Sequence, residues 1–137
     1  MRRRPARSAA RDRGAAAVEF ALLLPVLLLL VFGIIDFGRA LNAQITLTQA
    51  AREGARLAAL GQSNVVSGTQ AAATGLSPVT VSVTSCPANA GAGVNAVVGV
   101  SYAFSFVTPI NAIVGLFGSS VGSAITLTAQ GVMPCET

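Results

Sequence analysis

The sequence predicts a membrane-anchored α+β protein, with a long N-terminal helix followed by a small antiparallel β-sheet of about three strands. A long apolar run ending at Ile35 predicts the helix, and a change to a two-residue apolar period after Pro78 predicts the sheet. The composition agrees, because 53% of residues are hydrophobic and only 10% are charged. We expect four segments: a basic cytoplasmic leader (1–14), a long helix (15–60) with a transmembrane part (15–35), a linker (61–77) and an exported β domain (78–137).

The positive charge is confined to the N-terminal tail. Residues 1–14 contain six Arg and one Asp, a net charge of +5, whereas the rest contains three Arg and four acids, a net charge of −1. Arginines beside an apolar span mark its cytoplasmic side. We therefore expect residues 1–13 to be an irregular cytoplasmic tail of a single-pass membrane protein, with the C-terminal domain outside. Nucleic-acid binding is the alternative for a basic tail, but the body adds no basic patch, so no nucleic-acid partner is expected.

The apolar run has the length of a retained membrane helix. A helix from Ala15 to Ile35 would be about 31 Å long, close to the hydrocarbon thickness of a bilayer. This is too long for a secretory signal, and no small-residue cleavage site follows it. Pro25 lies inside the run and predicts a gentle kink. The helical composition continues to Leu60, and Gly61 is its predicted stop.

Two charged motifs follow the span on the same predicted helix. Asp36-Phe37-Gly38-Arg39 places an acid and a base three residues apart at the membrane exit, and Arg52-Glu53-Gly54-Ala55-Arg56 comes four turns later. Small residues recur every four positions around the second motif (Ala50, Gly54, Ala58; Ala51, Ala55, Ala59). Such spacing allows close approach of helix backbones. A chance recurrence in an alanine-rich segment is the alternative, and the sequence leaves both open.

The C-terminal half predicts the sheet. Apolar and small polar residues alternate within 79–84, 98–106 and 125–128, which is typical of half-buried strands. The linker predicts a short helix at 68–74, and the apolar segment 109–120 predicts a short helix or loop over one sheet face. Cys86 and Cys135 both fall in the exported domain, where an oxidising compartment favours a disulfide. Two free thiols remain the alternative, because no spacing shows that the cysteines meet.

No catalytic residue, metal site or cofactor is predicted. The chain has no His, no Lys and no Trp, so a Ser nucleophile would lack an imidazole base. No Cys/His cluster has the spacing of a metal site, and no glycine-rich loop matches a phosphate- or dinucleotide-binding pattern. An exported enzyme is therefore disfavoured.

Glu19 is the most informative single residue, because a carboxylate inside an apolar span costs roughly 2.5–3.5 kcal/mol at the bilayer centre. If the chain is cut after Gly14, Ala15 gains an α-amino group with an ordinary pKa of about 7.7–8.0, so it is mostly cationic at neutral pH. Glu19 lies one helical turn from that group, so its carboxylate could meet the amine of its own chain or that of a neighbouring subunit. Solvation of Glu19 at the headgroup boundary is the alternative.

The segment Gly14-Ala-Ala-Ala-Val-Glu19-Phe20 resembles the processing site of type IV pilin-like precursors. Together with Pro25 and the two charged motifs, residues 13–60 resemble the TadE-like family of tight-adherence (Flp) pilus systems. The resemblance implies that a prepilin peptidase cuts between Gly14 and Ala15 and that Glu19 and Phe20 serve subunit recognition and assembly.

The same resemblance implies the partners and role of the protein. The implied partners are other pilin or pseudopilin subunits, the pilus assembly machinery, the peptidase and membrane lipid, and the implied role is that of a pseudopilin or minor pilin. The alternative is an uncleaved single-span anchor that displays a small binding module outside the cytoplasm.

Overall fold

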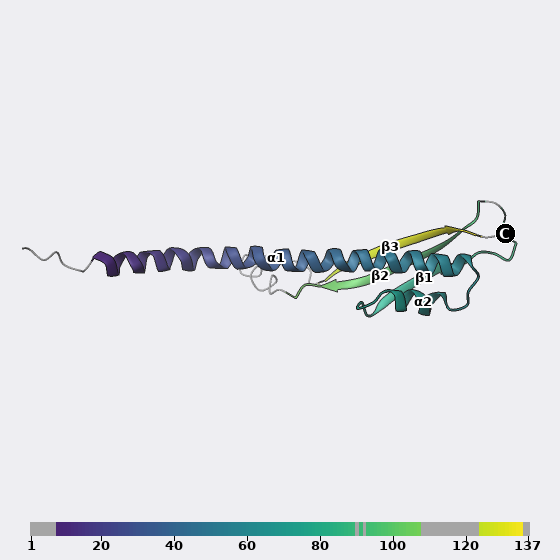
Figure 1. Ribbon diagram of the computed structural model, residues 1–137, viewed down its shortest axis with the longest axis horizontal. Helices are drawn as coiled ribbons and strands as arrows, with labels where there is room; N and C mark the ends of the chain where they lie inside the picture. Colours follow the sequence, from purple (N-terminus) through teal and green to yellow (C-terminus); the bar gives the residue numbers. More distant parts are fainter. Residues whose placement is uncertain (1–7, 90, 92, 108–123, 136–137) are drawn as a thin grey trace, which may run out of the picture.

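The computed structural model describes residues 8–89, 91, 93–107 and 124–135. Its elements, in chain order, are α1 (Ser8–Ala59), α2 (Val65–Ala72), β1 (Val79–Thr84), β2 (Asn95–Ser105) and β3 (Ala124–Pro134). Figure 1 shows α1 as a long rod, with α2 and the strands lying along its C-terminal half. The predicted α+β class, with one long helix and a three-stranded antiparallel sheet, is confirmed.

Helix α1 begins earlier than the sequence suggested. It starts at Ser8 rather than Ala15, so residues 8–13 are helical and not irregular. The reason is local, since Ala and Arg are among the strongest helix formers and this stretch contains no helix breaker. The helix continues through Pro25, and the expected kink is not evident in the view of Figure 1.

The C-terminal end of α1 follows the prediction. The helix ends at Ala59, and Gly61 has a φ of 66°, which a residue with a side chain rarely adopts. The Gly61 amide donates to the Ala58 carbonyl (3.2 Å) and the Gln62 amide to the Leu57 carbonyl (3.0 Å). This pair of bonds is the Schellman arrangement, which satisfies carbonyls left open at a helix end. The role of Gly61 as the helix stop is confirmed.

The sheet has the order β1-β2-β3, with both pairings antiparallel. Val100 of β2 sits opposite Val81 of β1 and Ala129 of β3, so these three residues form one row across the sheet. The same face packs on α1 and α2, and Val98 and Val100 are fully buried there. Strand β3 extends past the predicted 125–128 to Pro134 because its pairing with β2 continues after the apolar alternation fades.

Helix α2 covers the sheet next to β1. The short helix predicted at 68–74 lies at Val65–Ala72, slightly earlier in the chain. Thr69 is fully buried, and its hydroxyl donates to the Val65 carbonyl at 2.7 Å, so the buried oxygen is satisfied within the helix. The helix or loop expected at 109–120 lies outside the described residues.

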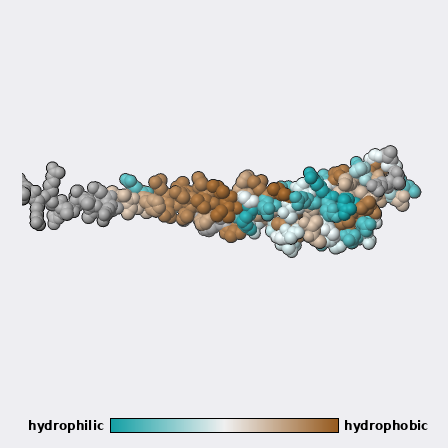
Figure 2. Space-filling view, viewed as in Figure 1, coloured by the Kyte–Doolittle hydropathy of each residue, from teal (hydrophilic) through white to brown (hydrophobic). Residues whose placement is uncertain are grey.

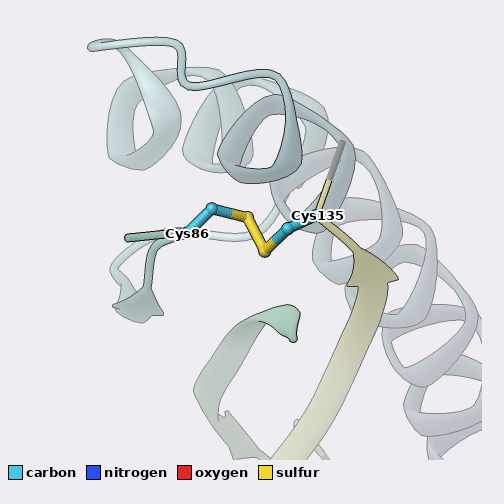
Figure 3. Close-up of a disulfide and its surroundings, with 2 residues drawn as sticks. All are labelled: Cys86 and Cys135. Atoms are coloured by element: carbon cyan, nitrogen blue, oxygen red, sulfur yellow. A yellow bond between two sulfur atoms is a disulfide. The ribbon is translucent and has the colours of Figure 1, made fainter. Parts of the chain in front are cut away.

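A disulfide joins the two edge strands at one end of the sheet (Figure 3). Cys86 follows β1 and Cys135 follows β3, and their Cα atoms are 5.8 Å apart. The Cys135 amide also donates to the Val94 carbonyl at 2.9 Å, beside the start of β2. The predicted pairing of the two cysteines is therefore confirmed.

Candidate functional site

Most of the N-terminal half of α1 is not covered by the rest of the described chain. Every residue from Gly14 to Val31 is exposed, although most are apolar, and Figure 2 shows this half as a continuous hydrophobic band. The most apolar window of the helix has a mean hydropathy of 2.8 and is not buried within the protein. By length and composition this helix is a candidate membrane anchor.

The predicted processing segment lies at the start of this exposed half. Gly14, Ala15, Glu19 and Phe20 are all exposed on consecutive turns of α1. A Cβ added at Gly14 would meet no atom within 4 Å, so no other segment packs against this side of the helix. The segment is thus sterically accessible to an enzyme or to another helix.

The first charged motif forms a latch between α1 and β2. Asp36 is 1% exposed, and its Oδ1 accepts a hydrogen bond from Arg39 Nη1 (3.2 Å) and another from the Val107 amide (3.3 Å). The Arg39 guanidinium also lies 5.3 Å from the centroid of the Phe104 ring, within the range of a cation–π contact. The pairing of Asp36 with Arg39 agrees with their spacing. This latch fixes the end of β2 to the helix where the apolar run ends.

The second charged motif forms the solvent face of α1. Arg56 donates to both carboxylate oxygens of Glu53, from Nη2 (2.7 Å) and Nε (3.0 Å). These hydrogen bonds hold the pKa of Glu53 below its ordinary value and raise the pKa of Arg56. Arg52 is exposed next to the pair. Since the pair is well exposed, it contributes little to folding.

Gly54, inside the same motif, lies on the opposite face and is buried. A Cβ there would overlap the Thr69 hydroxyl and lie 2.9 Å from Val98 Cγ1. Gly54 therefore lets α1 approach α2 and β2 at once. Both small-residue rows contribute to this buried face, with Ala50, Ala51, Ala55 and Ala58 all 1% exposed or less.

The structure thus favours a packing role for the four-residue spacing of small residues over a chance recurrence. The surface that packs against them belongs to the protein's own sheet and α2. Gly131 of β3 makes a second close approach, because a Cβ there would overlap the Ala51 carbonyl and lie 2.9 Å from the Arg52 nitrogen. Sequence reasoning missed Gly131, Val107 and Phe104. An isolated glycine near a predicted strand was the available signal for the first, since such a glycine often marks close backbone approach.

Other predicted site residues, such as Phe37 and Pro25, are exposed on α1. Among the residues that the structure describes, no group of three or more His, Cys, Asp or Glu could hold a metal ion. Phe37, beside the latch, is 66% exposed, and Pro25 lies in the exposed half of α1. Apart from Cys86 and Cys135, which follow β1 and β3, the predicted site residues are distributed along α1.

These features define a class of protein in which one helix is both a candidate membrane anchor and the packing surface of a small disulfide-bonded sheet. The family described as TadE-like protein matches residues 14–56 of this chain. The match begins at Gly14 and ends at Arg56, so it covers the processing segment and both charged motifs, and it confirms the resemblance over this region. Neither the comparison with curated proteins nor the one with solved structures finds a match.

Proposed function

We propose that the protein is a pseudopilin-like, minor-pilin component of a tight-adherence (Flp) pilus, cut after Gly14 by a prepilin peptidase and assembled through its N-terminal helix. The observation that carries this proposal is the exposed segment Gly14 to Phe20, which opens both the apolar half of α1 and the family match. Beyond the apolar half of α1, the described chain packs α1, α2 and the sheet around one core, as expected of a subunit with a structural role.

Glu19 supplies the assembly step in this proposal. Removal of residues 1–14 makes Ala15 the first residue of the helix and places a cationic amine one turn from Glu19. An exposed carboxylate in an apolar stretch pairs with such an amine much more strongly in lipid than in water, because the surrounding dielectric is low. The amine of a neighbouring subunit would therefore draw the two helices together.

Mass spectrometry of the protein purified from membranes tests the processing step. A mature chain beginning at Ala15 supports it, and Gly14→Ala should leave the leader in place. Gly38→Ala is the matched control, because both glycines are helical and an added Cβ at either meets nothing within 4 Å. An intact leader in cells with an active pilus system would instead favour the uncleaved single-span anchor.

Glu19→Gln tests the assembly step separately. We expect normal leader removal in this variant but loss of the protein from sheared or extracted pilus complexes, since the neutral side chain cannot form an ion pair with the cationic amine. Normal complexes containing the glutamine variant would contradict the role of Glu19 and leave the processing result unaffected.

A further inference from the structure

A hydrophobic groove lies where α1 leaves its apolar half and meets the end of the sheet. Its volume is about 350 Å³, and its walls include Gly33, Phe37 and Leu41 of α1, with Phe106 and Ile125 from the sheet side. Its polar wall residue Gln44 is already engaged, because its amide donates to the Thr128 carbonyl at 2.8 Å. The groove therefore offers an almost wholly apolar surface, and none of the roles described above for the charged motifs of α1 explains its exposure.

The groove is continuous with the apolar half of α1. Leu30, Ile34, Phe37 and Leu41 follow one another at intervals of four, three and four residues, so they share one side of the helix. They are 59%, 66%, 66% and 50% exposed, respectively. The exposed apolar stripe thus passes the latch without a break and ends beside Ile125, which is 41% exposed.

The groove extends along α1 from the end of the apolar span, through the headgroup layer of a bilayer, to just beyond it. If the span ends at Ile35, Phe37 and Leu41 lie about 3 and 9 Å beyond the hydrocarbon. The headgroup layer on each side of a bilayer is roughly 5–7 Å thick. The end of β2 points toward this level of the helix in Figure 1.

Aromatic and charged residues agree with that depth. The aromatic residues that the structure describes beyond Ile35 all lie near this end of the sheet (Phe37, Tyr102, Phe104, Phe106). Here the exposed charge is positive, because the Arg39 side chain is 47% exposed whereas that of Asp36 is 2% exposed. A cation beside aromatic and aliphatic side chains complements a lipid surface with phosphate headgroups.

We propose that the outer-leaflet lipid surface occupies this groove, so that the sheet domain rests in the headgroup layer with Val107 and Ile125 against the acyl-chain boundary. This inference rests on the membrane-spanning helix of the proposed function. It adds a second membrane contact, made by the sheet and independent of the span. Val107, at 72% exposed, is the most solvent-accessible apolar side chain near this surface.

The absence of Trp from the chain makes the test direct, since each introduced Trp is the only one. Ile125→Trp reports on the groove, and Met133→Trp is its matched control, because both lie on one face of β3 and are 41% and 39% exposed. Leu28→Trp reports insertion of the span. Val107→Trp is a second reporter beside the groove, next in the chain to the wall residue Phe106, and its 72% exposure means that a Trp there needs no repacking. The full-length variants are reconstituted into phosphatidylcholine/phosphatidylglycerol vesicles with or without acyl chains brominated near the headgroup.

We expect brominated lipid to quench Ile125→Trp and Val107→Trp about two-fold, as for side chains at a membrane interface, and to leave Met133→Trp unchanged. Groove reporters that behave like Met133→Trp would overturn the inference. Their emission would then depend on the protein-to-lipid ratio if a second copy fills the groove, or stay blue-shifted at every ratio if residues 108–123 cover it. If Leu28→Trp is the only variant quenched, the lipid contact of the groove is refuted and the membrane span stands. If Leu28→Trp is not quenched either, the proposed membrane span is refuted as well.

Discussion

Replacement of Gly54 by alanine tests whether α1 forms the core of the sheet domain. The added Cβ would overlap the Thr69 hydroxyl and lie 2.9 Å from Val98 Cγ1. Both neighbours are fully buried, and rotation of Thr69 would break its 2.7 Å hydrogen bond to the Val65 carbonyl. Neither side chain can therefore move away freely.

The expected loss follows from three opposing contributions. Overpacking of a dense core costs about 1–3 kcal/mol, and loss of the Thr69 hydrogen bond costs about 1 kcal/mol. The better helix propensity of alanine returns about 1 kcal/mol. We therefore expect Gly54→Ala to lower the free energy of unfolding by about 1–3 kcal/mol. In a domain of this size, each kcal/mol lost lowers the melting temperature by roughly 4–8 °C.

Gly38→Ala is the control on the same helix. An added Cβ there meets nothing within 4 Å, so only the propensity gain applies and stability should stay equal or rise by up to about 1 kcal/mol. Thermal and urea unfolding of the full chain in detergent, followed by circular dichroism and by the fluorescence of Tyr102, measures both variants. If Gly54→Ala proves as stable as Gly38→Ala, the close packing of α1 on α2 and β2 is refuted.

Three further changes probe the latch, the disulfide and the exposed ion pair. Asp36→Ala should lower the free energy of unfolding by about 1.5–3 kcal/mol, and Asp36→Asn should lower it less. The alanine variant should also accelerate hydrogen exchange of the amide that Asp36 binds at the end of β2. Unchanged exchange would contradict the latch. Replacing Cys86 and Cys135 by serine should lower the free energy of unfolding by about 4 kcal/mol, as the chain-entropy model gives for a crosslink between cysteines 49 residues apart. An unchanged urea midpoint would argue against this stabilising role of the disulfide. The lowered pKa of Glu53 means that its pairing with Arg56 stabilises the fold above the ordinary pKa of 4.5 and is lost as the pH falls through the lower folded-state pKa. Urea midpoints measured down to about pH 3 should therefore decline slightly more in the wild type than in Glu53→Gln, and identical profiles would refute the coupling.

Local sequence patterns were sufficient for the elements of the fold. The two-residue period predicted each strand, because alternation places one face in the core. Gly61 predicted the end of α1, because few other residues adopt its positive φ. The start at Ser8 was missed since the charge of the tail was given more weight than its helix propensity.

Contacts between distant segments were beyond local reasoning. The four-residue spacing around Gly54 showed that something approaches the helix closely, but the same spacing fits another helix or a sheet. Asp36 was predicted to meet Arg39, three residues away, yet its carboxylate also binds the Val107 amide, 71 residues further on. No periodicity encodes such a contact, because the tertiary fold alone brings the two segments together.

The continuity of α1 also sets a direction around the helix axis. Phe37 follows Glu19 by 18 residues, which is about five complete helical turns, so the two side chains leave the rod on the same side. Because α1 is continuous between Glu19 and Phe37, a rotation of the sheet domain about the helix axis rotates Glu19 by the same angle. Under the proposed function, a neighbouring subunit that approaches Glu19 therefore comes from the side of the helix that carries Phe37, and the orientation of the sheet domain determines the direction from which it can reach the Glu19 carboxylate.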